Sequence, residues 1–139
     1  VVYSNGNKGK ELNGVRSPHD LELDTSNNIW LADAGNSRLL LFSPELEILE
    51  ELSKKAYDFK GVRYLDITAD GMIIAADKNN HVVKFIAADR NLVYTLGNGK
   101  SGRGEYELTT PEGVELRGST LWIADSGNDR IIKYQFEVK

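Results

Sequence analysis

Hydrophobic and polar residues alternate in short runs along the chain, a pattern typical of half-buried β-strands. Residues 20–24 (DLELD) alternate strictly, and apolar runs follow at 29–33 and 38–42, each bounded by Asn, Gly or Ser. Pro44 ends the third run, and a fourth strand is expected from Leu46 to Leu52. The stretch 44–55 also contains residues that favour a short helix. Its counterpart at 91–96 (NLVYTL) reads as strand, so we expect an all-β chain.

The strand pattern occurs three times. Residues 28–42 (NIWLADAGNSRLLLF) recur as residues 120–134 (TLWIADSGNDRIIKY), with a degenerate copy at 72–85 (MIIAADKNNHVVKF). The aspartates that end the apolar runs, Asp33, Asp77 and Asp125, are 44 and 48 residues apart. Periods of about 40 to 50 residues that contain only strand patterns are typical of β-propeller blades, each with four antiparallel strands.

The N-terminus carries a further repeat. Residues 1–10 (VVYSNGNKGK) are similar to residues 92–100 (LVYTLGNGK), and both lead through a glycine-rich loop to a proline, Pro18 or Pro111. We therefore expect a single propeller segment over residues 1–139. An outer strand at 1–4 precedes blade repeats at about 18–61, 62–110 and 111–139, twelve strands in all.

This strand order leaves a blade unfinished at each end. Unpaired strand edges need partners, and three blades are too few to close a ring, since propellers have four to eight. The sequence therefore predicts self-association. The simplest arrangement is a symmetric homodimer with six blades, in which each N-terminal strand completes the last blade of the other chain. An open assembly, or blades of a longer parent chain, would satisfy the same edges.

At these residues the chain resembles the NHL repeat, in which a Pro-led strand precedes an apolar strand ending in Ala-Asp, an Asn-x-Arg turn and a strand ending in an aromatic residue. The first and third copies match well. In the second copy Val62 replaces the proline, His81 replaces the arginine, and one residue is missing after Asp77. The resemblance implies the fold, but such folds serve many functions.

The recurring residues are expected to be structural. The three aspartates should accept hydrogen bonds from backbone N–H groups, and two of them from the guanidinium groups of Arg38 and Arg130. Left-handed turn positions are expected at Asn36, Asn79 and Asn128. Core packing is expected of Trp30 and Trp122.

Positions that differ between equivalent blades are better candidates for function. The residue after the leading proline is His19 in the first copy, Arg63 in the second and Glu112 in the third. Repetition of the fold does not require this variety, so the three residues are predicted to form a surface at the central channel that binds a protein or a small ligand. The alternative is that they are ordinary solvated loop residues.

His19 has a second interpretation. The segment Pro18-His19-Asp20 resembles the Pro-His segment that supplies zinc ligands in the peptidyl-hydroxyglycine amidating lyases, which are six-bladed propellers. The resemblance implies a metal-assisted lyase or hydrolase, with His19 as a ligand of zinc or calcium. Only His19 matches, because Arg63 and Glu112 stand at the corresponding positions. A dimer would supply two copies of His19 but not three histidines. No other cofactor is expected.

Composition narrows the range of partners. The formal net charge is −4 and the pI is about 5.2, so nucleic acid, RNA included, and anionic membranes are not expected partners. The chain has no cysteine, which excludes disulfides and thiolate metal sites. No apolar run is long enough for a membrane-spanning helix. The glycine-rich loop at 97–104 (GNGKSGRG) is not followed by a helix, so it does not match a phosphate-binding loop.

The sequence thus favours a non-catalytic recognition or assembly module over an enzyme. The first residue is not methionine, which fits a processed product or a fragment of a longer protein. An extracellular or cell-surface setting is expected for such a module. Neither the ligand nor the compartment follows from the residues.

Overall fold

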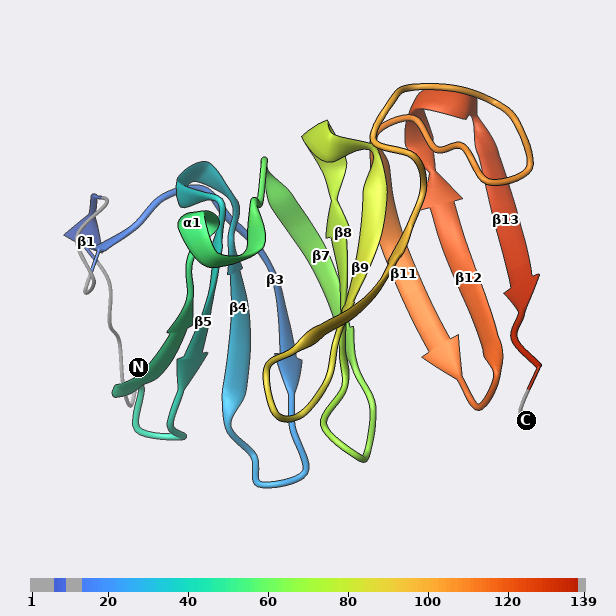
Figure 1. Ribbon diagram of the computed structural model, residues 1–139. Helices are drawn as coiled ribbons and strands as arrows, with labels where there is room; N and C mark the ends of the chain where they lie inside the picture. Colours follow the sequence, from blue (N-terminus) through green and yellow to red (C-terminus); the bar gives the residue numbers. More distant parts are fainter. Residues whose placement is uncertain (1–6, 10–13, 138–139) are drawn as a thin grey trace.

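The computed structural model describes residues 7–9 and 14–137 as a row of three antiparallel sheets (Figure 1). Blade 1 contains β3 (Pro18–Leu23), β4 (Ile29–Asp33), β5 (Arg38–Phe42) and β6 (Ile48–Leu52). Blade 2 contains β7 (Val62–Ile67), β8 (Ile73–Asp77), β9 (Val82–Ile86) and β10 (Leu92–Leu96). Blade 3 contains β11 (Pro111–Arg117), β12 (Thr120–Asp125) and β13 (Arg130–Gln135). The expected strand Val1–Ser4 lies outside the described residues.

The remaining elements are short. β1 (Asn7–Lys8) and β2 (Gly14–Val15) form a two-residue parallel pair that the sequence pattern did not predict. Within each blade a 3-10 turn joins the second and third strands: η1 (Ala34–Asn36), η2 (Lys78–Asn80) and η3 (Ser126–Asn128). α1 (Lys54–Tyr57) is a single helical turn that follows β6. The stretch 44–55 therefore contains the expected strand and the start of this turn, and β6 begins two residues later than expected. Among the described residues no helix has the length and apolar character needed to span a membrane.

The blades lie side by side, and the first strand of each faces that of the next. β3 contacts β7, and β7 contacts β11, so these three are the inner strands (Figure 1). Each sheet is built from consecutive strands, in the order β3-β4-β5-β6, β7-β8-β9-β10 and β11-β12-β13. The prediction of an all-β chain made of propeller blades is confirmed, with four, four and three strands in the described part.

Hydrophobic side chains fill the two spaces between blades. One cluster joins blades 1 and 2 around Trp30, Leu39, Phe59 and Leu65. The other joins blades 2 and 3 around Ile74, Leu121 and Ile123. Because each blade is a single layer, its faces are buried only where another blade covers them.

The three repeated aspartates are fully buried and form the same hydrogen bonds in each blade. Each carboxylate accepts from the backbone N–H of the residue two before an inner strand, at 2.7 Å in all three blades: Arg16, Lys60 and Thr109. Each also accepts from the asparagine at the end of the 3-10 turn: Asn36, Asn80 and Asn128. Arg38 Nε and Arg130 Nε complete the set in blades 1 and 3, at 2.7 and 2.8 Å. The predicted structural role of these carboxylates is confirmed.

Blade 2 uses a different cation. Val82 pairs with Asp77 in the strand register, as Arg38 pairs with Asp33, so Val82 and not His81 stands at the arginine position. No residue is missing after Asp77, because all three 3-10 turns have the same length. Lys84, two residues further along β9, reaches back so that its Nζ lies 2.7 Å from Asp77 Oδ2.

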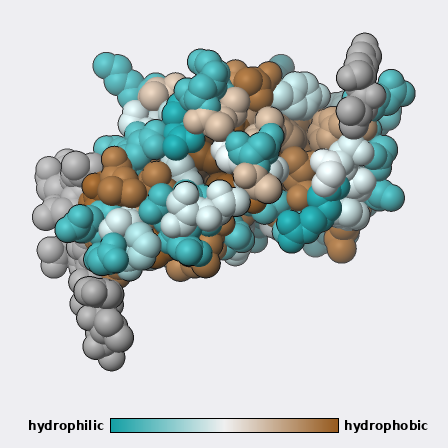
Figure 2. All heavy atoms as spheres, turned by 90° about the horizontal axis from the view of Figure 1, so that it is seen from below, coloured by the Kyte–Doolittle hydropathy of each residue, from teal (hydrophilic) through white to brown (hydrophobic). Residues whose placement is uncertain are grey.

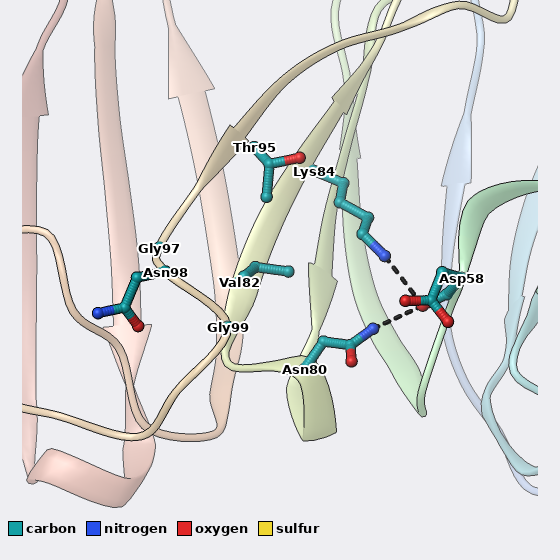
Figure 3. Close-up of a pocket in the computed structure, with 8 residues that line it drawn as sticks. All are labelled: Asp58, Asn80, Val82, Lys84, Thr95, Gly97, Asn98 and Gly99. Carbon is teal, nitrogen blue, oxygen red and sulfur yellow. Dashed lines mark hydrogen bonds between the residues drawn. The ribbon is translucent and has the colours of Figure 1, made fainter.

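The substitution leaves a hollow beside the turn. Figure 3 shows Lys84 and Asn80 pointing toward Asp58, whose backbone oxygen accepts from Lys84 Nζ at 3.1 Å and from Asn80 Nδ2 at 2.5 Å. The surrounding space of about 290 Å³ is lined in part by Val82 and Thr95. In the strand register Thr95 lies opposite Lys84, as Glu51 lies opposite Leu40 in blade 1. Glu51 is also an ion-pair partner of Arg38. The hollow thus lies where an arginine side chain lies in blade 1, and we assign it no ligand.

Two further expectations are corrected. The left-handed turn residues are Ser37, His81 and Asp129, not the asparagines, and the second asparagine of the set is Asn80 rather than Asn79. Trp30 is buried as expected, but Trp122 is exposed, as are Leu21 and Leu23 of the alternating segment. These three exposed side chains lie on the outer faces of the end blades, which no other described blade covers.

Candidate ligand site at the start of the inner strands

The local backbone explains how His19, Arg63 and Glu112 are displayed. Each lies just after the first residue of an inner strand, where the pairing register shifts by a β-bulge. A bulge leaves a residue outside the ladder and turns its side chain away from the sheet faces. The residue before each inner strand, Ser17, Gly61 or Thr110, has a positive φ of 47°, 77° or 47°.

The bulges bring the three predicted residues to one end of the row of blades, where the inner strands begin. Arg63 Nη1 lies 3.7 Å from Glu112 Oε1, which joins blades 2 and 3. The His19 ring packs edge-on against Tyr64 of β7, with 6.1 Å between ring centroids, which joins blades 1 and 2. All three side chains are exposed or half-buried, so they are accessible to a ligand.

A polar hollow of about 300 Å³ opens between blades 1 and 2 at this end. Its lining comes from the segment before β3, the turn η1, the start of β7 and the turn η2: Arg16, Ser17, His19, Ala34, Gly35, Gly61, Arg63 and Asn79. Arg16 and Arg63 are the two cationic residues of the lining, and Asn79 is a third residue with a long polar side chain.

Lys78 extends the positive charge toward blade 3. Its Nζ lies 2.6 Å from Glu112 Oε1, and the side chains are only 21% and 28% exposed. The hydrogen bond from Lys78 is the main reason that the pKa of the Glu112 carboxyl lies below its ordinary value; partial burial opposes this shift, and the nearby charges of Arg63 and His19 add to it. Glu112 is therefore ionised at neutral pH and holds Lys78 and Arg63 beside the hollow.

The charges at this site do not cancel. Arg16, Arg63 and Lys78 are cationic, and among the described residues Glu112 is the carboxylate that pairs with Arg63 and Lys78, which leaves two positive charges in excess without counting histidine. Asp20, the next residue along β3, points to the neighbouring strand, where its Oδ2 accepts from the Leu65 N–H at 3.0 Å. The arrangement suits a carboxylate or phosphate group, which arginine side chains bind through paired hydrogen bonds.

Sequence reasoning identified three of these residues and missed Arg16, Lys78 and Asn79. The missed residues vary between blades as the predicted ones do: Ala34, Lys78 and Ser126 begin the three 3-10 turns, and Arg16, Lys60 and Thr109 precede the three inner strands. Applying the same criterion to the turn residues would have found Lys78.

His19 was also predicted as a metal ligand. Within residues 7–9 and 14–137, no three His, Asp, Glu or Cys side chains lie close enough together to hold a metal ion. The neighbours of His19 in the hollow include Arg16 and Arg63, which are not metal ligands and would repel a divalent cation.

Comparison with known proteins gives the fold. No family model matches the chain, and no curated protein matches it in sequence. Virginiamycin B lyase from Staphylococcus aureus matches in structure with a TM-score of 0.58 at 14% identity, over 88% of this chain and 42% of that one. A protein of unknown function from Bacteroides caccae matches with a TM-score of 0.68 at 11% identity, over 86% of this chain and 46% of that one.

A streptogramin B lyase structure matches with a TM-score of 0.59 at 12% identity, over 88% of this chain and 41% of that one. The chain therefore spans less than half the length of each of these structures. At such low identity the likeness shows the fold alone. Together with the three antiparallel sheets, it makes this chain part of a β-propeller.

Proposed function

We propose that this chain is a recognition module of the NHL-repeat kind, which binds a carboxylate or phosphate group of its ligand at the start of the inner strands. The polar hollow between Arg16 and Arg63 carries the proposal, because two arginines line it beside a surplus of positive charge. His19 and Glu112 belong to the same surface, where Glu112 positions Lys78 and Arg63. The repeated Asp-turn sequence supports the NHL assignment.

Titration calorimetry with inorganic phosphate and with acetate tests the proposal. Low ionic strength is needed because salt screens exposed charges. We expect Arg16→Gln and Arg63→Gln each to weaken binding by about tenfold, since a hydrogen bond to a charged group contributes about 1.5–3 kcal/mol. Arg117→Gln is the matched control: this arginine is also exposed but lies at the other end of β11. Equal losses in all three variants, or no binding of either anion, would contradict the proposal.

A metal-assisted lyase is the second candidate, and it is supported by the fold shared with virginiamycin B lyase. The residues around His19 give it less support, because they form no group of three metal ligands in the described part of the chain. Thermal melting with and without zinc, on the intact chain and on His19→Ala, distinguishes the candidates. A rise in melting temperature that depends on both zinc and His19 would favour the lyase.

We also propose that the chain self-associates to complete the propeller. Residues 1–4 are similar in sequence to β10, which is the outer strand of blade 2 and leads through a loop to the inner strand of blade 3. Blade 3 has three strands among the described residues, and β13 is its outer edge. An N-terminal strand from a second copy would supply the fourth. Light scattering on the intact chain and on a variant without residues 1–4 tests this, with a weaker assembly expected for the deletion.

A further inference from the structure

The faces of the three blades are equivalent position by position. Strand pairing places Trp30, Ile74 and Trp122 at the same site in blades 1, 2 and 3, and likewise Leu39, Val83 and Ile131. Trp30 is 2% exposed and Ile74 0%, because each packs against the following blade, whereas Trp122 is 37% exposed. Leu39 and Val83 are 0% exposed, whereas Ile131 is 80% exposed. Blade 3 thus presents, uncovered, the face that blades 1 and 2 bury.

The other end of the row presents the complementary face. Leu21 of β3 corresponds to Leu65 of β7, since both pair with the third residue of the next strand. Leu65 is 2% exposed and packs in the cluster between blades 1 and 2, whereas Leu21 is 58% exposed and its neighbour Leu23 57%. Figure 2, from below, shows hydrophobic groups at the surface at both ends of the row.

One polar contact between blades also repeats, and it leaves an acceptor on blade 3 without a counterpart. The residue that ends each 3-10 turn accepts from the backbone N–H just before the next inner strand: Ser37 Oγ from Gly61 at 2.9 Å, and His81 Nδ1 from Thr110 at 3.0 Å. Asp129 is the third residue of this series, and its side chain is also an acceptor. The corresponding donor at the start of blade 1 is the N–H of Ser17.

A second polar contact joins blades 2 and 3. Asp66 Oδ2 in β7 accepts from the Leu116 N–H in β11 at 2.6 Å. Glu115 stands in blade 3 where Asp66 stands in blade 2, opposite Trp122 and Ile74 respectively. Val114 in blade 3 is equivalent to Leu21 in blade 1. Leu116 and Leu23 each follow two residues later, so they are also equivalent.

From these equivalences we infer that the outer face of blade 3 docks on the outer face of blade 1 of a second copy. Trp122 and Ile131 cover Leu21 and Leu23 of the second copy, Asp129 accepts from its Ser17 N–H, and Glu115 accepts from its Leu23 N–H. The occupant is a second copy because this chain carries both halves of the contact, and both halves match contacts it already makes internally. The inference rests on the self-association proposed above and adds its surfaces. Two such contacts related by a twofold axis close six blades.

The head-to-tail geometry gives a sharp test by sedimentation velocity. Ile131→Glu places a charge on the blade 3 face and Leu21→Glu one on the blade 1 face; both positions are exposed, so folding should be little affected. Every contact joins a blade 3 face to a blade 1 face, so either variant alone has a charge in every contact. The dissociation constant of each variant should therefore rise at least about tenfold, as expected when an apolar contact is replaced by a charge. An equimolar mixture should recover part of the association, because the intact blade 1 face of one variant fits the intact blade 3 face of the other, whereas the second contact of the ring carries both introduced charges. Val93→Glu, an exposed position on β10 away from both faces, is the control.

The outcomes separate the two proposals. A monomeric intact chain overturns both the self-association and this interface. A dimer that persists in Ile131→Glu and Leu21→Glu overturns the interface and leaves the self-association standing. Loss of association in one variant only contradicts the head-to-tail arrangement. A Trp30→Phe chain, in which Trp122 is the one remaining tryptophan, should show a blue shift of emission as concentration rises; an unchanged spectrum on dimerisation contradicts burial of Trp122.

Discussion

His81 Nδ1 accepts the backbone N–H of Thr110 at 3.0 Å and so joins the turn of blade 2 to the start of blade 3. His81 has a left-handed backbone, with φ at 57°, and this conformation directs its side chain toward the neighbouring blade. Ser37 makes the equivalent bond to Gly61 one blade earlier. A serine and a histidine therefore form the same hydrogen bond between blades, because the position needs only a side-chain acceptor on a residue that tolerates a positive φ.

His81→Ala should lower the free energy of unfolding by about 0.5–1.5 kcal/mol, the usual contribution of one hydrogen bond. His81→Ser should recover part of the loss, since serine makes this bond at position 37 with a φ of 53°. Urea unfolding of the three proteins measures both effects. Equal losses in the Ala and Ser variants would show that packing of the imidazole, rather than the hydrogen bond, stabilises the junction.

Lys84→Met should be the most damaging single change in blade 2. The lysine is buried, its Nζ contacts Asp77, and it also lies 5.2 Å from the centre of the Phe59 ring. Methionine keeps the apolar stem but leaves Asp77 without its cation, and breaking a buried ion pair costs about 3–5 kcal/mol. A loss below about 1 kcal/mol in urea unfolding would contradict this role.

The double variant Val82→Arg/Lys84→Leu should rescue much of that loss. It recreates in blade 2 the arrangement of Arg38 and Leu40 in blade 1, and the hollow of about 290 Å³ beside Val82 gives the guanidinium room. The single variant Val82→Arg is the control, because its arginine would compete with Lys84 for Asp77. A double variant no more stable than Lys84→Met would show that the two blades are not interchangeable.

Glu112 should contribute to stability above its ordinary pKa, near 4.5, because the folded state lowers the pKa of its carboxyl. The contribution is lost as the pH falls through the lowered folded-state pKa, where the carboxylate becomes protonated and releases Lys78. The difference in melting temperature between the intact chain and Glu112→Gln should therefore shrink between about pH 6 and pH 2. A difference that stays constant over this range would contradict the ion pair.

Glu22 should act in the opposite direction. Partial burial, followed by the nearby charges of Asp20, Asp66 and Glu115, raises the pKa of its carboxyl. The folded state thus holds the proton more tightly, and the stability this provides at low pH is lost as the pH rises through the raised value. Glu22→Gln should raise the melting temperature at neutral pH. The corresponding gain in the free energy of unfolding should be no more than about 0.5 kcal/mol, because solvent screens the group. The gain should vanish in acid.

The repeat made much of the fold predictable. The strands Ile29–Asp33 and Arg38–Phe42 begin and end where the sequence indicated, and the buried aspartates accept the predicted hydrogen bonds. The register of the second copy was misread because its cation moved from the arginine position to Lys84, which only the three-dimensional reach of the side chain reveals. Trp122 was misplaced because burial at its position depends on the next blade, not on its own strand.

The candidate site was partly predictable for a related reason. Variation between equivalent positions identified His19, Arg63 and Glu112, and the bulges that turn them outward occur in all three blades. Arg16 and Lys78 come from segments adjacent to the inner strands, and their approach to the site depends on how neighbouring blades pack. No pattern within one repeat specifies that packing.

A row of blades that touch only their neighbours behaves as a linear chain of coupled units. Blade 2 is packed on both faces, whereas blades 1 and 3 each have one uncovered face. Amide hydrogens of β8 should therefore exchange with solvent most slowly, and those of the end blades should exchange through local opening that leaves the centre intact. Closing the row would remove this gradient, so exchange rates in β4 and β12 would report, strand by strand, whether the ends have found their partner.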